Sequence, residues 1–296
     1  MNGSIQWIRT ADRSALKRRS LILTSFAILA CGGLAHGQTL TVTNGLALWL
    51  KADSLALSDG QSVSTWTDSS TNGNNATQGT VSAQPMFHTG LFNGKPGVRF
   101  DGTSDFLALS RIGLPSGLTY FAVFRTTSTD STRGYAGNAA LTILGDNHPL
   151  FVYNGFGVTG GKGEFNAFDQ PSGSGWEHYN SATTVNDGVA RDMIATFASS
   201  DNTPRLYVNG LLEASGTTDY GEPFVGINRV GGGYLDGSGT GDLYDGDLAE
   251  ILIYDTVLSG SDRQSAHEYL VAKYALPEPS AIALLAVTGV LLWRRR

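Results

Sequence analysis

The sequence predicts an all-β fold, a two-sheet antiparallel sandwich that carries one short C-terminal helix. Thirty-eight glycines and many Ser, Thr, Asn and Asp residues separate short runs rich in β-branched and aromatic side chains. This is the pattern of strands joined by turns. Within residues 38–276, helical spacing occurs in one stretch near the end. We therefore expect these residues to form one sandwich domain, long enough to bury a sizeable core.

Individual strands are indicated by the spacing of their apolar residues. Residues 97–101 alternate, with Val98 and Phe100 on one face. Residues 118–124 are apolar on both faces, which predicts a central strand that is covered twice. The same reasoning gives three further groups: Met193, Ala195 and Phe197 on one face; Leu206 and Val208 on another; and a last strand over residues 248–254.

Two local signals predict a turn and the helix. Asn209-Gly210 stands between two strand-like runs, and both residues tolerate positive φ, which favours a hairpin. Residues 261–264 fit a capping box that opens a helix ending near Tyr274. Helical spacing predicts that one side of it packs on the sandwich, through Ala266, Tyr269, Leu270, Lys273 and Tyr274.

Residues 1–37 are typical of a signal peptide with a helical apolar segment. Basic residues 17–19 precede the apolar stretch 21–30, and small residues precede a cut before Gln38. The stretch is shorter than the roughly 20 residues that span a bilayer. A retained membrane helix and lipidation of Cys31 are the alternatives. Cys31 is the only cysteine, so cleavage before Gln38 leaves a mature protein without disulfides.

Residues 277–296 predict a short hydrophobic helix at the C-terminus. Pro277, Glu278 and Pro279 precede the apolar run 281–293, and the chain ends on three arginines, Arg294, Arg295 and Arg296. The run is about 20 Å long as a helix, against roughly 30 Å of bilayer hydrocarbon. Such a segment suits a transient membrane tether whose arginines stay on the cytoplasmic side.

This tail resembles the PEP-CTERM sorting signal of Gram-negative bacteria. The resemblance implies that an exosortase in the inner membrane recognises the tail, after export through the signal peptide and signal peptidase. It also implies a final location at the cell surface or in the extracellular matrix. An ordinary tail anchor is the alternative.

The middle of the chain also resembles a known family. The resemblance rests on the order of seven segments: residues 45–50, 66–68, 73–76, 100–102, 206–210, 246–251 and 269–274. Together they resemble the bacterial laminin-G-like (concanavalin A-like) jelly-roll family. The resemblance implies a sandwich that often binds a ligand at its rim, frequently with calcium. It fixes no ligand, because this fold includes lectins, adhesins, hydrolases and spacers.

Charge excludes some partners. Residues 38–276 contain 12 basic and 24 acidic side chains, a net charge of −12. Such a surface repels nucleic acid and anionic membranes, and it favours cations or neutral ligands.

Catalytic patterns are missing from the sequence. A hydrolase of this class needs two converging carboxylates, and the nearest candidate is Glu250. Its strand face holds Leu252 and Tyr254, while Asp255 points to the other side. The sequence has no Gly-x-Ser-x-Gly elbow, and the histidines do not have zinc-ligand spacing. We therefore predict no catalytic residues and no enzymatic activity.

Calcium is the one cofactor that the sequence suggests. Oxygen-bearing side chains alternate in one loop, at Asp68, Ser70, Asn72 and Asn74, as suits a hard cation. Asp245 and Asp247 could form a second site or contribute to the first. Turns rich in Asn and Asp are also common without metal, so this alternative stays open.

A short aromatic segment is the candidate for sugar binding. Trp176, His178 and Tyr179 occur in a stretch rich in Gly and Ser that we expect to be a loop. An aromatic ring there can lie against a sugar while polar neighbours bind its hydroxyls. The rings can equally fold back onto the sandwich. The leading hypothesis is an exported, lectin-like protein that binds an extracellular polysaccharide or matrix ligand. A spacer without a ligand and a polysaccharide-cleaving hydrolase are the alternatives.

Overall fold

The computed structural model describes residues 39–114, 117–129, 141–145, 154–169, 175–198, 200, 202–217, 224–232 and 243–278. Within them the chain forms antiparallel sheets and one C-terminal helix, as the all-β prediction requires. The predicted signal peptide, Cys31, Pro279 and the three terminal arginines lie outside these residues. No described helix is long and apolar enough to cross a membrane.

The described strands form two sheets of eight. The first sheet has the order β14 (Leu211–Ser215), β13 (Arg205–Val208), β12 (Arg191–Ala198), β7 (Gly117–Arg125), β16 (Asp245–Tyr254), β5 (Lys95–Asp101) and β4 (Met86–Phe92), with β1 (Leu46–Lys51) beside β16. The second has the order β11 (Gly175–Thr184), β10 (Lys162–Asp169), β9 (Asn154–Thr159), β8 (Leu141–Gly145), β15 (Phe224–Val230), β6 (Leu107–Leu114), β3 (Ala76–Thr77) and β2 (Thr65–Trp66). Two 3₁₀ turns, η1 (Ala52–Ser54) and η2 (Val81–Ala83), and helix α1 (Gly260–Tyr274) complete the described elements.

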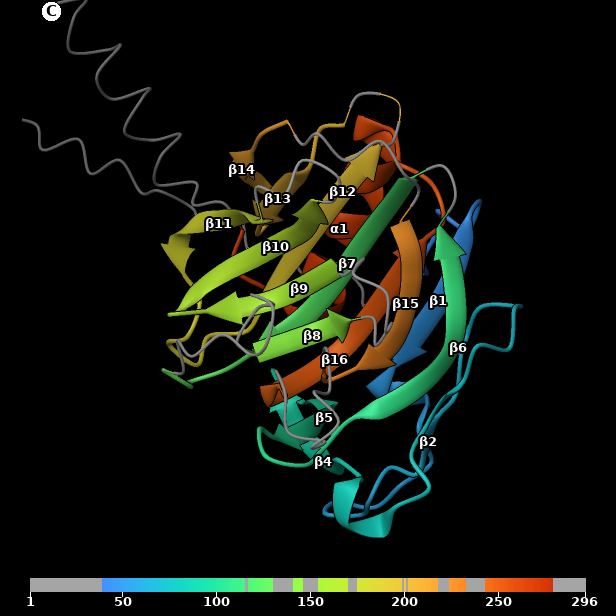
Figure 1. Cartoon of the computed structure of the whole chain (residues 1–296). Helices are drawn as coiled ribbons and strands as arrows, with labels where there is room; N and C mark the ends of the chain where they lie inside the picture. The colour runs from blue at the N-terminus through green and yellow to red at the C-terminus, as the bar shows by residue number, and fades with distance from the viewer. Residues whose placement is uncertain are drawn as a thin grey trace, which may run out of the picture. The chain divides into compact units, whose positions relative to one another are not determined.

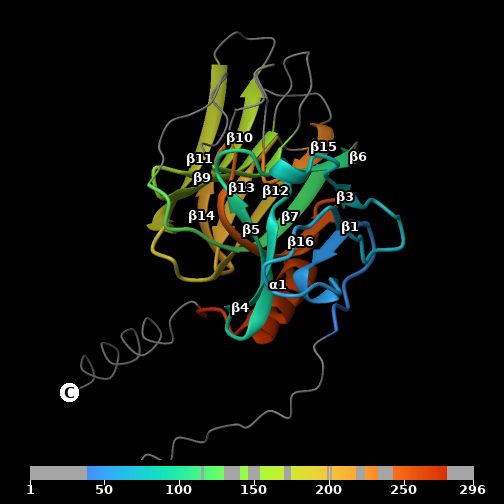
Figure 2. The same ribbon diagram turned by 90° about the horizontal axis from the view of Figure 1, so that it is seen from below.

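The sheets lie face to face, and α1 covers the outer side of the first sheet (Figure 1). Figure 2 shows the same order from below, with α1 on the side of β7 and β16 away from β9 and β10. The central strand β7 therefore packs on both sides. Tyr120, Ala122 and Phe124 belong to the cluster between the sheets, whereas Phe121 and Val123 belong to the cluster under α1. The prediction of a strand covered twice is confirmed.

The core between the sheets follows the predicted alternation. Val98 and Phe100 of β5 enter it together. So do the other predicted groups: Met193, Ala195 and Phe197 of β12, and Leu206 and Val208 of β13. The hairpin prediction is also confirmed, because Asn209 has φ 48° and Gly210 has φ 72° between β13 and β14.

Helix α1 begins earlier than predicted. Ser259 is its N-cap, and the Ser259 Oγ accepts a hydrogen bond of 3.1 Å from the backbone N–H of Asp262. The predicted cap at Ser261 is therefore wrong, because the Ser-x-x-Asp pair two residues upstream satisfies the free N–H groups first. The predicted packing side is confirmed, with Ala266, Tyr269, Leu270 and Tyr274 buried.

The segment predicted as an aromatic loop is mostly a strand. Residues 175–184 form β11, which pairs with β10 along its length. The loop prediction is wrong for these residues. It relied on the glycine and serine content of the segment, although the residue types also alternate as in a strand. In a strand, neighbouring side chains point to opposite faces, which separates His178 from Tyr179.

Candidate functional site

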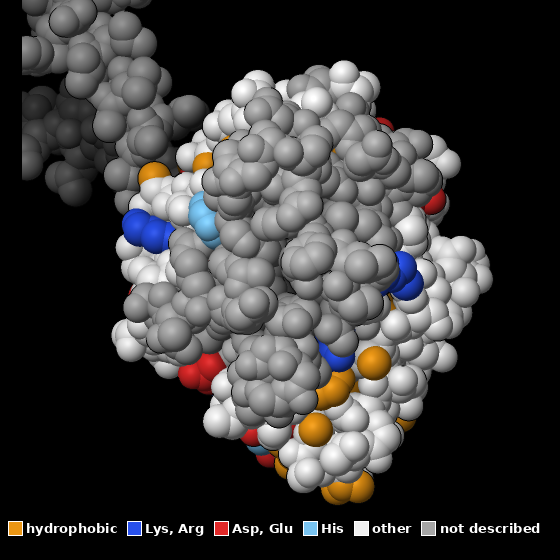
Figure 3. All heavy atoms as spheres, viewed as in Figure 1, with side chains coloured by type: hydrophobic (Ala, Val, Ile, Leu, Met, Phe, Trp, Pro, Cys, Tyr) orange, Lys and Arg blue, Asp and Glu red, His pale blue; other side chains and the backbone are white. Residues whose placement is uncertain are grey.

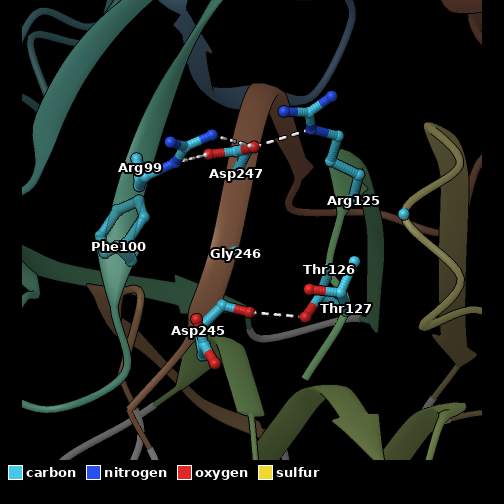
Figure 4. A pocket seen from close by; sticks show the side chains of 9 residues that line it. Arg99, Phe100, Arg125, Thr126, Thr127, Asp245, Gly246 and Asp247 are labelled. Atoms are coloured by element: carbon cyan, nitrogen blue, oxygen red, sulfur yellow. Dashed lines mark hydrogen bonds and ion pairs between the residues drawn. The ribbon is translucent and has the colours of Figure 1, made fainter. Parts of the chain in front are cut away.

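Three charged side chains form a ladder across the first sheet. Strand β16 lies between β5 and β7, and its register places Asp247 opposite both Arg99 and Arg125. Asp247 Oδ1 lies 2.7 Å from Arg99 Nε, and Asp247 Oδ2 lies 3.1 Å from Arg99 Nη2. Asp247 Oδ2 also lies 2.7 Å from Arg125 Nε. Figure 4 shows the two guanidinium groups on either side of the carboxylate.

The ladder faces outward because its neighbours in sequence face inward. Phe100, Phe124 and Leu248 point into the core between the sheets, so the residues next to them point to the other side. The Asp247 side chain is only 6% exposed, against 46% for Arg99 and 30% for Arg125. A buried carboxylate is stable when charged donors satisfy it. The hydrogen bonds to Asp247 raise the pKa of the Arg99 guanidinium, although partial burial opposes this.

An open pocket of about 320 Å³ lies against this ladder. We call it the arginine–aspartate pocket; its lining residues are Arg99, Phe100, Arg125, Thr126, Thr127, Gly188, Asp245, Gly246 and Asp247. Asp245 and Asp247 share a strand face. In Figure 4 the Asp245 side chain lies with Thr126 and Thr127 at the end of the pocket away from the guanidinium groups. The pocket therefore has a donor end and an acceptor end.

Hydrogen bonds hold the backbone under the pocket in place. Thr126 Oγ1 donates to the Asp245 carbonyl at 2.6 Å, which ties the ends of β7 and β16 together. The Tyr244 hydroxyl donates to the Arg125 carbonyl at 3.0 Å from inside the core. Burial raises the pKa of Tyr244 well above its ordinary value, so this phenol stays protonated and remains a donor.

The predicted calcium loop is built around one carboxylate. Asp68 Oδ1 accepts from the backbone N–H groups of Trp49 and Ser70 at 2.9 and 2.8 Å. Its Oδ2 accepts from the Ser70 hydroxyl and the Asn74 N–H at 2.7 and 2.8 Å. Protein donors therefore already engage both oxygens.

The two asparagines of this loop also bind the chain itself. The side-chain N–H₂ groups of Asn72 and Asn74 donate to the carbonyls of Leu46 and Ala47. Asn72 and Asn74 line a separate hollow of about 530 Å³, so the structure does not bring this loop to Asp245 and Asp247. Among the described residues, no group of three or more His, Cys, Asp or Glu side chains is arranged to hold a metal ion.

The predicted aromatic platform is divided between two faces. Tyr179 packs against the core between the sheets. His178 lies on the other face, where its Nδ1 is 2.5 Å from Oε1 of the buried Glu164. The structure therefore does not present these two rings together. The backbone of Trp176 pairs with Phe168 in the sheet, but its side chain lies outside the described atoms.

The predicted sorting motif begins where the packed part of the described chain ends. Leu276 is 4% exposed and belongs to the cluster under α1. Asn93 fixes the chain just before it, since its side-chain amide donates to the Tyr274 carbonyl at 2.6 Å. Pro277 and Glu278 follow and are exposed.

A family profile described as the concanavalin A-like lectin/glucanases superfamily, Laminin_G_3, matches residues 101–262, more than half of the chain. The chain belongs to this superfamily. The laminin-G-like resemblance of the sequence is thereby confirmed, with Arg125, Asp245 and Asp247 inside the matched segment. The PEP-CTERM resemblance of residues 277–296 lies outside it and stays a prediction.

Solved structures share the fold of this superfamily member at low sequence identity. The binding domain of Paraclostridial mosquitocidal protein 1 superposes with a TM-score of 0.53 and 13% identity, over 76% of this chain and 52% of that one. Domain 4 of AbnA, an extracellular arabinanase of Geobacillus stearothermophilus solved with arabinotriose, gives 0.52 and 14% over 75% and 98%. The ligand-binding domain of botulinum neurotoxin serotype D, solved with N-acetylneuraminic acid, gives 0.51 and 14% over 76% and 51%.

These likenesses bear on the fold alone. The chain spans about half the length of the two toxin structures. Comparison with proteins of curated function gives no match.

Several charged groups that organise this concanavalin A-like domain are not indicated by local sequence patterns. Arg99 adjoins the core residues Val98 and Phe100 of an alternating strand, and Arg125 directly follows the run of residues that is apolar on both faces. Glu250 was considered only as a catalytic acid. In the structure its two oxygens accept from Trp49, Tyr269, Lys273 and Tyr274 at 2.6 to 2.8 Å. The sequence signal for this role was the position of Glu250, a charged residue inside an otherwise apolar strand.

A second buried pair was also missed. His267 of α1 has its Nδ1 2.7 Å from Oδ2 of Asp192 in β12, and both residues are buried. Burial lowers the pKa of His267, but the hydrogen bond and charge of Asp192 outweigh this and raise it overall. Both Glu250 and Asp192 bind groups of α1. Among these clusters, the arginine–aspartate pocket is the one that opens to solvent with charged donors and acceptors.

Proposed function

We propose that this chain is an exported, non-catalytic carbohydrate-binding protein, whose concanavalin A-like domain binds a saccharide in the arginine–aspartate pocket. One observation carries the proposal: an open, polar hollow of about 320 Å³ whose two arginines are held in place by Asp247. Two arginines and a buried aspartate fix the donor end, and Asp245 and Thr127 stand at the acceptor end.

The chemistry of this pocket suits sugar hydroxyls. Each hydroxyl both donates and accepts a hydrogen bond, so a site that offers guanidinium donors and carboxylate acceptors can satisfy several at once. The ion pairs fix the arginine side chains before binding, which reduces the entropy lost when a ligand arrives. The saccharides solved with the arabinanase domain and the neurotoxin domain support the proposal, because those domains have the same fold.

Binding without catalysis is supported by the way the acids are used. Asp245 and Asp247 share a face of β16, but both oxygens of Asp247 accept hydrogen bonds from arginines. A glycosidase needs one carboxyl that donates a proton and a second that acts as base or nucleophile. A carboxylate held by two guanidinium groups is poorly placed for either task. Glu250 is enclosed by four donors of its own.

Export is proposed on the sequence alone. The basic and apolar residues before Gln38 support a signal peptide, and residues 277–296 support an exosortase-recognised tail with a transient tether. Intact mass of protein recovered outside the cell tests this. We expect a species beginning at Gln38 and lacking the terminal arginines, and full-length protein confined to the cytoplasm would contradict it.

Glycan-array binding tests the carbohydrate proposal. We expect the domain spanning residues 38–276 to bind at least one glycan class, and the Arg125→Gln variant to lose that binding. Lys95→Gln is the matched control, because Lys95 is an exposed cation on β5 outside the pocket lining. If the wild-type domain binds no glycan or matrix polymer, the proposal fails and a spacer becomes the better reading. Release of shortened oligosaccharides would instead indicate a hydrolase.

A further inference from the structure

The two arginines of the pocket do not use all of their donors. Arg125 binds Asp247 through Nε alone, and Arg99 binds it through Nε and Nη2. In the described part of the chain, no acceptor is bonded to the two Nη atoms of Arg125. Figure 4 shows these two atoms at the free end of the Arg125 side chain, beyond the Nε atom that bonds Asp247. They form the forked end of the guanidinium, which matches a carboxylate through two parallel hydrogen bonds.

The position of this fork is fixed from two directions. Asp247 holds Nε at 2.7 Å, and the ring of Phe92 lies 5.8 Å from Arg125 Cζ, within the range of a cation–π contact. Phe92 is itself fully buried under α1. Because the Arg125 side chain is restrained before binding, it loses little conformational entropy when a carboxylate binds.

The remaining groups of the pocket suit the hydroxyls of a saccharide that carries this carboxylate. Asp245 lies two residues from Asp247 along β16, which is about 7 Å in a strand, and the guanidinium of Arg125 lies beside Asp247 at the end of the pocket away from Asp245. A saccharide whose carboxylate meets Arg125 can therefore extend along the pocket and present hydroxyls to Asp245 and Thr127. A purely neutral sugar would leave the charged fork with weaker partners.

We infer that the arginine–aspartate pocket selects a saccharide that bears a carboxylate, such as a hexuronate or sialic acid residue. This inference rests on the proposed carbohydrate-binding function and adds the class of sugar. The carboxylate would lie end-on against Arg125, supported by Arg99, with Asp245 and Thr127 binding hydroxyls of the same saccharide.

The charge of the domain restricts the kind of chain that carries this sugar. Residues 38–276 have a net charge of −12, which repels a densely charged polyanion. On the face shown in Figure 3, the described Lys and Arg side chains stand as isolated spots, without a continuous basic surface. Attraction by the fork acts within about 8 Å at physiological salt. The pocket therefore suits a single acidic residue at a chain end, or one set among neutral sugars.

Matched oligosaccharides test this inference. The probes are a glucuronate-terminated and a sialic acid-terminated trisaccharide, each paired with its carboxyl-reduced, neutral counterpart, titrated by calorimetry into the domain of residues 38–276. We expect at least one acidic probe to bind roughly 10- to 100-fold more tightly than its neutral counterpart, as for a charge-assisted bidentate pair.

Three variants assign the effect to the fork. Arg125→Gln should abolish the preference for the acidic probe, while the ion pair between Asp247 and Arg99 remains. Arg125→Lys keeps the charge but loses the fork, so it should also lose most of the preference. Lys95→Gln should leave it unchanged, and thermal unfolding checks that each variant folds.

The outcomes separate this inference from the proposed function. Equal binding of acidic and neutral probes, binding of neutral glycans only, or a preference that survives in Arg125→Gln overturns the selection of a carboxylate and leaves carbohydrate binding standing. Failure to bind these probes and every glycan on the array overturns both.

Discussion

Glu250 and Lys273 meet between the first sheet and helix α1, with Lys273 Nζ 2.7 Å from Glu250 Oε2. The side chain of Glu250 is fully buried, and that of Lys273 is 9% exposed. Glu250 also accepts from the Trp49 ring and from two tyrosine hydroxyls. A β-bulge between Leu248 and Glu250 turns this acid toward the helix. The pair therefore fixes α1 on the outer side of the sandwich.

Replacing Glu250 should strongly destabilise the domain. Glu250→Gln removes the charge opposite Lys273 and makes two of the four donors face an N–H₂ group, because each Glu250 oxygen accepts from two of them. Breaking a buried ion pair in this way costs about 3–5 kcal/mol, and we expect the lower end because Lys273 retains Asp53 at 3.0 Å. Urea unfolding measures the loss. Glu268→Gln, an exposed acid on the same helix, should change stability by less than about 0.5 kcal/mol. Equal effects of the two variants would contradict this role.

The buried pair of His267 and Asp192 predicts a dependence of stability on pH. The pKa of His267 is raised in the folded state, so folding favours its protonated form. This stabilisation is fully present below the unfolded value of about 6.5 and is lost as pH rises through the folded value. His267→Gln should therefore cost more stability at pH 5.5 than at pH 9, as thermal unfolding across this range would show. A cost that grows with pH would have the wrong sign. His88→Gln, on the surface beside Asp59, is the control.

Asp105 is a carboxyl group whose ionised form is disfavoured in the folded state, and this predicts a second dependence of stability on pH. Burial and the neighbouring charge of Asp101 raise its pKa to about 6. Its ionised form therefore costs stability above pH 6, and this cost disappears as pH falls toward 4. Asp105→Asn should stabilise the domain at pH 8, by at most about 3 kcal/mol, and change little at pH 4. The amide oxygen can still accept from the Asp101 N–H, now bonded at 3.1 Å.

Asp101→Asn provides the contrast for this measurement. Burial tends to raise the pKa of Asp101, but backbone N–H donors from Ser104, Thr103 and Asp105 hold it well below its usual range. Ionised Asp101 therefore contributes stability above pH 4, which this variant loses. Thermal unfolding at pH 8 should move in opposite directions for the two variants, and a shared direction would contradict the assignment.

The elements that could be predicted from sequence are those whose signal is local. The faces of β5 and β12 follow from alternation, and the hairpin at Asn209-Gly210 follows from two residues that tolerate positive φ. The N-cap of α1 was misplaced because Ser259 and Ser261 are each followed, three positions later, by a polar residue able to complete a cap. Strand β11 was missed because its glycine, serine and threonine resemble a loop.

The candidate pocket could not be predicted because its contacts are distant in sequence. Asp247 lies 148 positions from Arg99 and 122 from Arg125. Only the order of strands in the first sheet, with β16 between β5 and β7, brings the three together. Asp245 and Asp247 stand out in the sequence as acids that could bind calcium, whereas the arginine partners of Asp247 do not. Local sequence patterns therefore reveal Asp247 but not the two distant arginines that neutralise it.

The hairpin beside α1 predicts a difference between two glycine substitutions. A Cβ at Gly210 would lie 2.5 Å from Nε2 of His267, whereas a Cβ at Gly60 would meet nothing within 4 Å. Both glycines have positive φ, so Ala costs about 1–2 kcal/mol of backbone strain at either site. Gly210→Ala should cost more, because His267 must also move. Equal losses of unfolding free energy for the two variants, measured in urea, would show that His267 does not restrict the space at this turn.

The carboxylate of Asp68 predicts the response of the domain to calcium. Four protein donors hold its two oxygens, and a cation would have to displace them. We therefore expect neither added Ca²⁺ nor a chelator to change the thermal unfolding of the domain. Asp68→Ala should destabilise it by at least about 2 kcal/mol with or without the metal, because several N–H and O–H groups lose their acceptor. Asp59→Ala is the control, since Asp59 is largely exposed and accepts from Thr89 at the surface. A rise in unfolding temperature with Ca²⁺ that disappears in Asp68→Ala would show instead that the loop exchanges these donors for a metal.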